Sequence, residues 1–161
     1  MRISTGVTVN VSANTERWLS EIRSGRAFAT AATQAGVAGE LSFVQLFNPA
    51  ASPVTVLTRF AMAWSGTSEE VSVRVYNTAL TTLVGNGTNL LDGGAASVAE
   101  FRSQSNVADL GAGLASVSIP ANDAKEIGRE WLVELAPGQG LLVRGNTANT
   151  AITGSFFWVE V

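Results

Sequence analysis

Hydrophobic and polar residues alternate along most of the chain, which is the pattern of β-strands that bury one face. In the segment Glu70–Tyr76, for example, Val71, Val73 and Val75 alternate with charged or small polar residues. Residues typical of turns separate such runs about every 8 to 12 residues. The chain is therefore expected to be all-β.

The alternating runs predict about eight strands, and strands of this spacing favour a jelly-roll-like β-sandwich. One connection, Ala136–Gln139, has proline and glycine where a type II turn needs them. A bulge is expected near Val44, where the alternation is mixed. The strands are predicted at Leu41–Asn48, Val54–Trp64, Glu70–Tyr76, Thr81–Val84, Leu114–Ile119, Trp131–Leu135, Leu141–Arg144 and Ile152–Val161.

The glycine-rich segment Gly85–Gly113 interrupts this rhythm. Within it, Ala95–Gln104 has the pattern of a helix, and the rest is expected to be loop. A loop of this length inside a domain is usually functional or ordered by a partner.

The last predicted strand is apolar on both of its faces. Ile152, Phe156 and Trp158 share one face and are expected in the core. An apolar second face indicates burial against something else, and we assign it to a subunit interface. The residues of this predicted interface are Phe157, Val159 and Val161.

The first forty residues are expected to form an arm and linker, residues 1–40, ahead of the sandwich domain, residues 41–161. Asn14 is a suitable N-cap and Gly25 a suitable residue to end a helix, so a short amphipathic helix is predicted over residues 15–24. Residues 26–40 have small, weakly apolar side chains and are interpreted as an extended linker.

A helix of this length is marginal alone in water, so it has to pack on the domain or on a partner. Its predicted apolar stripe is Trp18, Leu19 and Ile22, and its exposed sides carry Arg17, Glu21 and Arg23. We expect the arm to dock on a partner through Arg17, Trp18, Ile22 and Arg23.

Charge is scarce and unevenly distributed. Charged residues make up 14% of the 161 residues, against about 25% in typical soluble domains. Residues 1–60 hold five arginines and three glutamates, whereas residues 61–161 hold five basic and ten acidic groups, for a net charge of −3. This balance does not favour nucleic-acid binding but suits docking of the N-terminal third on an acidic surface. No signal peptide or membrane span is expected.

The sequence contains no cysteine and no histidine, which excludes disulfides, cysteine nucleophiles and histidine-based catalysis. The acidic residues Asp123, Glu126 and Glu130 lie near a turn without the aromatic neighbours of a glycosidase cleft. Asp92–Gly94 lacks the further ligands of a calcium loop. We therefore expect no catalytic residue, no cofactor and no metal ion.

Two parts of the chain resemble small β-sandwich virion proteins of tailed bacteriophages. The first is Leu46–Ala50 (LFNPA) with the strand up to Trp64, and the second runs from Leu135–Leu141 (LAPGQGL) through Asn146–Thr150 (NTANT) to the closing Trp158–Glu160. The resemblance covers roughly residues 41–161. It implies a head decoration (cement) protein that is homotrimeric, binds the major capsid protein or another virion protein, and is assembled into the virion in the host cytoplasm.

Two other functions remain open. One is a receptor- or carbohydrate-binding module at a tail tip or fibre, which would use the Gly85–Gly113 segment together with Tyr76 and Trp64. The other is a glycan hydrolase that uses Glu126 and Glu130. Core packing is expected instead for the tryptophans that lie within strand patterns, which are Trp64, Trp131 and Trp158.

Overall fold

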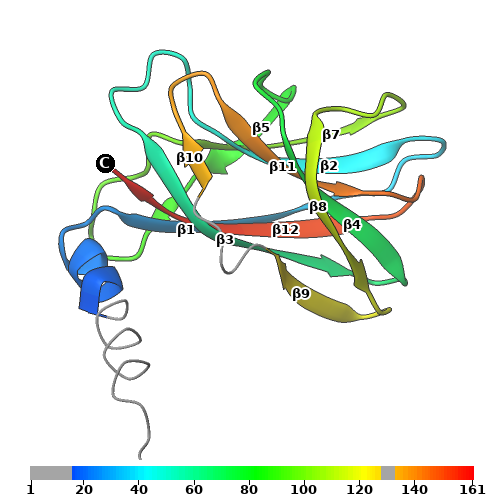
Figure 1. Cartoon of the computed structure of the whole chain (residues 1–161), viewed down its shortest axis with the longest axis horizontal. Helices are drawn as coiled ribbons and strands as arrows, with labels where there is room; N and C mark the ends of the chain where they lie inside the picture. The colour runs from blue at the N-terminus through cyan, green and yellow to red at the C-terminus, as the bar shows by residue number, and fades with distance from the viewer. Residues whose placement is uncertain (1–15, 128–132) are drawn as a thin grey trace, which may run out of the picture.

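Two six-stranded antiparallel sheets face each other in the computed structural model of the chain (Figure 1). The structure describes residues 16–127 and 133–161. A short N-terminal helix, residues 16–23, lies at one end of the sandwich beside the start of β1 (Figure 1). The strands are β1 (Ala27–Gln34), β2 (Leu41–Phe47), β3 (Val56–Ser65), β4 (Glu69–Val75), β5 (Thr82–Asn86), β6 (Thr88–Asn89), β7 (Glu100–Asn106), β8 (Ala112–Ile119), β9 (Asp123–Ile127), β10 (Val133–Leu135), β11 (Gly140–Gly145) and β12 (Ile152–Glu160).

The strand order is that of a jelly roll. Sheet A has the order β10-β3-β12-β1-β6, with β9 also paired to β3, and sheet B has the order β5-β7-β2-β11-β4-β8. The chain crosses between the sheets at β1–β2, β2–β3, β3–β4, β5–β6, β6–β7, β8–β9, β10–β11 and β11–β12. The central strands β9/β10-β3-β12-β1 therefore face β8-β4-β11-β2. The predicted all-β, jelly-roll-like sandwich with a short N-terminal helix is confirmed.

The core between the sheets is built around aromatic side chains. Trp158 is fully buried and stacks on Phe28 with ring centroids 5.9 Å apart, and Phe101 meets Phe156 edge to face at 5.7 Å. Each such buried side chain contributes roughly 1.5–3 kcal/mol. Gly87 has to be glycine, because a Cβ atom there would overlap the ring of Trp158.

Residues 26–40 are not a linker. Strand β1 pairs with β12 over its whole length, from Ala27 opposite Val159 to Gln34 opposite Ile152. The sandwich therefore begins at Ala27, and the predicted boundary at residue 41 is wrong. The prediction failed because β1 is built mainly of alanine and threonine, whose hydrophobic contrast is weak, while the bulk of this part of the sheet comes from the aromatic residues of β12.

The segment between β4 and β8 is a β-structured insertion rather than a loop with a helix. It extends both sheets at one edge, since β7 pairs with β2 and β6 pairs with β1. The helix predicted over Ala95–Gln104 is wrong, because Glu100–Asn106 pairs as a strand along all of β2. The register of β2 is unbroken with both of its neighbours, so the bulge expected near Val44 is also absent from it.

A buried carboxylate fastens this insertion to the last strand. Glu160 is 8% exposed and accepts hydrogen bonds from the backbone N–H groups of Val98 (3.0 Å) and Ala99 (3.1 Å) and from the hydroxyl of Ser97. The indole N–H of Trp158 also donates to it, at 3.4 Å. Four donors around one carboxylate offset the cost of burying it.

The outer face of sheet B is covered by the chain itself. Phe43, Leu80 and Leu142 form a second buried cluster there, outside the main core. The side chain of Gln45 is fully buried and donates to the carbonyls of Tyr76 (3.0 Å) and Thr78 (3.0 Å), while its carbonyl accepts from the N–H of Leu80 (2.9 Å). These bonds hold residues 76–80 over the sheet.

Asp109 secures a second covering segment, the connection between β7 and β8, whose Leu110 also packs against the cluster. Its carboxylate forms ion pairs with Arg74, at 2.6 Å, and with Arg144. Burial raises the pKa of Asp109, but the hydrogen bond and charge of Arg144 and the charge of Arg74 outweigh this effect and hold the pKa below its ordinary value of 3.8.

Because the pKa of Asp109 is lower in the folded protein, its ion pairs stabilise the fold above pH 3.8 and lose this contribution as the pH falls through the folded pKa. We expect Asp109→Asn to reduce the free energy of unfolding by about 0.5–1 kcal/mol at neutral pH, a small value because the side chain is mostly exposed. Urea unfolding over a pH series measures this. The matched control Asp92→Asn, at an exposed turn, should change nothing; an equal loss in both variants would contradict the assignment.

Candidate docking surface

A bulge in β3 decides which residues of sheet A face outward. Phe157 of β12 pairs with Phe60, but the next residue, Trp158, pairs with Thr58. Arg59 is therefore an extra residue in β3, and the alternation of side chains reverses on its two sides.

The buried residues of β3 change parity at this bulge. Val56 and Thr58 point into the core before it, and Ala61 and Ala63 do so after it, all at most 2% exposed. An unbroken strand would have placed Trp64 on the same side as Val56. The prediction that Trp64 belongs to the core is wrong, since its side chain is 40% exposed.

The result is an apolar outer surface on sheet A, which we call the open face. Its members come from the adjacent strands β1, β12 and β3, and all are half-buried or exposed. Neither β1 nor β12 brings a charged side chain to it, because β1 has none and Glu160 of β12 points inward. The outward residues of these strands are Ala29, Ala31, Thr33, Met62, Trp64, Thr153, Ser155 and Phe157, and Glu126 of β9 lies at the edge of the face, opposite Met62.

The N-terminal helix is tied down at its C-terminal end, as the predicted role of Gly25 requires. Gly25 has φ 71°, and its N–H donates to the carbonyl of Ile22 (2.9 Å), while the N–H of Arg26 donates to that of Glu21 (3.1 Å). This is a Schellman motif. The side-chain amide of Asn89 then donates to the carbonyl of Gly25 at 2.8 Å, which links the helix end to the insertion.

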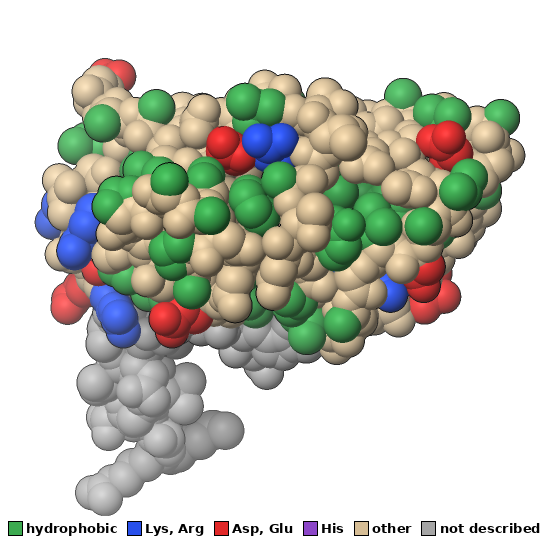
Figure 2. Space-filling view, turned by 90° about the horizontal axis from the view of Figure 1, so that it is seen from above, with side chains coloured by type: hydrophobic (Ala, Val, Ile, Leu, Met, Phe, Trp, Pro, Cys, Tyr) green, Lys and Arg blue, Asp and Glu red, His purple; other side chains and the backbone are tan. Residues whose placement is uncertain are grey.

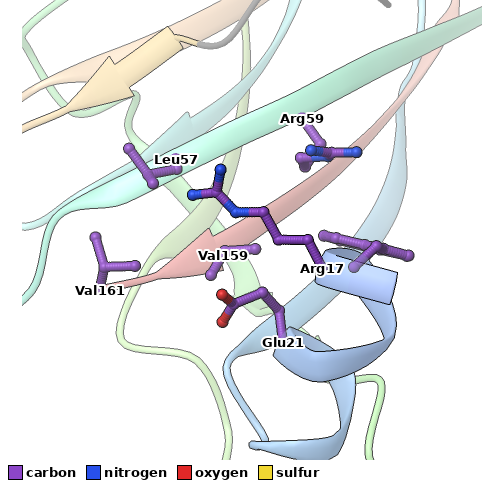
Figure 3. Close-up of a pocket in the computed structure, with 7 residues that line it drawn as sticks. Arg17, Glu21, Leu57, Arg59, Val159 and Val161 are labelled. Carbon is purple, nitrogen blue, oxygen red and sulfur yellow. The ribbon is translucent and has the colours of Figure 1, made fainter. Parts of the chain in front are cut away.

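A small pocket lies between this helix and the ends of β3 and β12 (Figure 3). Its cavity volume is about 60 Å³. In Figure 3, Arg17 reaches from the helix across the pocket toward Leu57, and Glu21 lies below Val159. The apolar floor consists of Leu57, Val159 and Val161, and the remaining lining residues are Arg17, Trp18, Glu21 and Arg59.

Trp18 and Arg59 hold the helix and the bulge together. The guanidinium carbon of Arg59 lies 5.2 Å from the ring centroid of Trp18, within the range of a cation–π contact. Glu21, which we had expected on an exposed side, is only 16% exposed in its side chain and pairs with Arg26 at 2.8 Å. Leu19, expected in the apolar stripe, is 41% exposed. The side of the helix that packs on the sandwich therefore includes Glu21 in place of Leu19.

The structure unites the two groups of residues predicted to make contacts. Arg17 and Trp18 of the predicted docking set line the same pocket as Val159 and Val161 of the predicted subunit interface. Val159 is 5% exposed and Val161 is 52% exposed. Val159 therefore forms a floor inside one chain and has little surface left for a neighbouring subunit.

The other predicted contact residues lie outside the pocket. Ile22 is half-buried and Arg23 is exposed on the helix, while Phe157 is half-buried on the open face. Leu57 and Arg59 were not among the predicted contact residues. The available signal for Arg59 was that it is the only charged residue of the apolar run Val54–Trp64.

The residues of the alternative functions are not brought together. Strands β12 and β1 separate Trp64 on β3 from the insertion strand β6, and Tyr76 packs against the buried cluster on sheet B. Glu126 lies on β9 opposite Met62, whereas Glu130 and Trp131 lie outside the described residues, as does Asn14. Across residues 16–127 and 133–161, no group of three potential metal-ligating side chains occurs. The same residues contain no helix with the length and hydropathy of a membrane span.

Comparison of the chain with models of protein families, with curated proteins and with solved structures finds no match.

The contact between Trp18 and Arg59 generates a prediction about the helix. We expect Trp18→Ala to remove about 1 kcal/mol of local stabilisation and to raise amide exchange over residues 16–23 several-fold. The stability of the sandwich should not change, since its main core contains no helix residue. Exchange measured by mass spectrometry tests this, with Leu19→Ala as the exposed control on the same helix. Unchanged exchange in Trp18→Ala would disprove the anchoring role.

Proposed function

We propose that the protein is a structural virion protein of a tailed bacteriophage, a decoration protein that binds the head shell and stabilises it as a trimer. The observation that carries this proposal is the open face. The exposed side of an antiparallel sheet is normally polar, and contiguous apolar surface without charge is typical of interaction sites. Here sheet B has a covering of its own, and sheet A presents apolar residues from three adjacent strands.

A trimer requires contact between two different surfaces of neighbouring subunits, because three-fold symmetry cannot be built from one self-complementary patch. The insertion supplies a second apolar surface at the edge of the sandwich. Figure 2 shows hydrophobic side chains scattered widely over one face of the molecule, with few charged groups among them. The exposed apolar residues of β5 and of the segment between β6 and β7 are Leu83, Val84, Leu90, Leu91 and Val98.

The segments that carry the resemblance to phage virion proteins lie side by side in the fold, which supports the proposal. Asn48 of the first segment exchanges backbone hydrogen bonds with the second, donating to Gln139 (2.9 Å) and accepting from Gly138 (2.8 Å). Its side-chain amide also donates to the carbonyl of Leu135 at 3.0 Å. Within the second segment, the side-chain oxygen of Asn149 accepts from the N–H of Gly39 at 2.6 Å, outside the resembling part. The bonds of Asn48 thus connect the first segment with the turn that opens the second.

Decoration of a shell needs no reactive group. A protein that binds only the assembled shell stabilises it by mass action, and a trimer adds avidity because three arms bind at once. In this proposal the sandwich trimerises, and the helix with Arg17, Trp18, Ile22 and Arg23 docks on the major capsid protein of particles assembled in the host cytoplasm.

Self-association through the open face is tested by placing a charge in it. Ala31 is exposed on β1, so Ala31→Glu adds a carboxylate without removing a buried contact. We expect the unmodified chain to sediment as a trimer of 16.7 kDa subunits and Ala31→Glu to sediment as a monomer at the same concentration. Val107→Glu, at a side chain that is 76% exposed outside the open face, is the matched control. A trimer in both variants would contradict the role of this face, and a dimer of the unmodified chain would contradict three-fold assembly.

Docking on the particle is tested by deleting residues 1–25. The main core contains no residue of this segment, so the truncated chain should fold and still trimerise. We expect gold-labelled full-length protein to decorate the heads of the phage that carries the gene and the truncated protein to leave them bare. Decoration by the truncated protein would refute docking through the arm, and labelling at the tail would identify a tail component instead.

A further inference from the structure

Arg17 and Arg59 are two cations without a carboxylate partner in the part of the chain that the structure describes. Its ion pairs involve Arg26, Arg74, Arg102, Lys125 and Arg144 but neither of these two arginines. Both line the pocket between the helix and sheet A, together with Glu21, whose carboxylate is paired with Arg26 (Figure 3). An anion bound in this pocket would be attracted by both guanidinium groups.

We infer that this pocket binds an acidic and partly apolar segment of a partner protein. The guanidinium groups of Arg17 and Arg59 bind a carboxylate of that segment, and a neighbouring apolar side chain packs on the floor formed by Leu57, Val159 and Val161.

The geometry of Arg59 suits a carboxylate in particular. The guanidinium carbon of Arg59 lies 5.2 Å from the centroid of the Trp18 ring, so an aromatic side chain already covers one side of the guanidinium group. Stacking uses the flat face of a guanidinium and leaves its N–H groups available for a carboxylate. The ring also removes water from one side, which strengthens a charge-assisted hydrogen bond.

The acidic lining residue does not supply the missing anion. Glu21 is paired with Arg26 at 2.8 Å, and its side chain is 16% exposed. Glu21 therefore neutralises a third arginine rather than Arg17 or Arg59.

The size of the pocket indicates a docking segment rather than a small molecule. Sites for drug-sized ligands enclose about 300–1,000 Å³, whereas this cavity is about 60 Å³. That volume accepts part of one side chain, so most of the binding surface has to lie outside the cavity.

The charge around the pocket favours an acidic protein as the partner. The described residues 16–60 hold four arginines, Arg17, Arg23, Arg26 and Arg59, against the three glutamates Glu16, Glu21 and Glu40, so this part carries a net charge of +1. Basic and acidic groups are both visible at the helix end of the molecule in Figure 2. The chain as a whole carries a net charge of −3, so the rest of the protein would repel an acidic partner and orient it toward this end.

This inference deepens the proposed function and rests on it only for the identity of the partner, which would be an acidic segment of the shell protein. The chemistry of the pocket is testable without any particle.

The test uses the full chain and two fluorescein-labelled peptides. In one peptide glutamate alternates with leucine, and in the matched peptide glutamine replaces each glutamate. By fluorescence anisotropy we expect the glutamate peptide to bind at least about tenfold more tightly than the glutamine peptide, and its binding to weaken as ionic strength rises from about 50 to about 300 mM. The double variant Arg17→Gln with Arg59→Gln should lose this preference. Lys125→Gln, which removes a positive charge from β9 outside the pocket, should keep it.

Equal affinity for both peptides, or the same loss in Lys125→Gln as in the double variant, would overturn the inference. A double variant that binds as the unmodified chain does would also overturn it. If the double variant is unfolded by circular dichroism, Arg17→Gln alone decides, because Arg17 is exposed and has no ion pair among the described residues. If the double substitution converts the trimer to a monomer, a second copy occupies the pocket and the assignment to a different protein is wrong. Selective peptide binding without particle decoration would support binding of an acidic segment in the pocket and contradict the decoration function. Decoration without selective peptide binding would support the decoration function and contradict binding of an acidic segment in the pocket.

Discussion

The position of β12 between β1 and β3 is the constraint on which the rest of the structure depends. Both of its backbone edges are used, by β1 over eight paired residues and by β3 over nine. Its side chains contact several different parts of the structure. Trp158 fills the core, Glu160 fastens the insertion, and Val159 forms the pocket floor. One strand thus connects the core, the insertion and the candidate docking surface, so that none of these can shift without the others.

The two outer faces of the sandwich differ in how far the described part of the chain covers them. On sheet B, the buried amide of Gln45 and the carboxylate of Asp109 each hold a covering segment in place beside a small apolar cluster. On sheet A, the described part of the chain covers only the end beside the helix. In the proposed function, the free energy that would come from covering the open face drives association with other subunits.

Sequence patterns were sufficient for the strands with strong alternation and for turns with a stereochemical requirement. The strand at Glu69–Val75 and the turn at Gly138, with φ 84°, agree with their predictions. The patterns failed where the contrast was low or where the alternation changed parity. Strand β1 was not predicted because alanine and threonine differ little in hydrophobicity, so its buried and exposed positions look alike. The strands of the insertion were not predicted because its many glycines interrupt the alternation of apolar and polar residues.

The candidate site was only partly predictable for the same reason. Arg17 and Trp18 stand out in a helix, but the pocket also needs Leu57 and Arg59, whose orientation depends on the bulge. A bulge arises from pairing with a distant strand, here β12, and such pairing is not visible in local periodicity.

The extra residue at position 59 also sets which length of β3 fits the sheet. Loss of that single residue would remove the bulge and leave Val56, Thr58, Ala61 and Ala63 together on the inner face of a regular strand. A strand that kept all its residues without a bulge would instead turn Met62 and Trp64 toward Trp158, in a space that is already filled. The bulge therefore lets the chain insert an arginine beside the helix while the inner face of β3 stays the same.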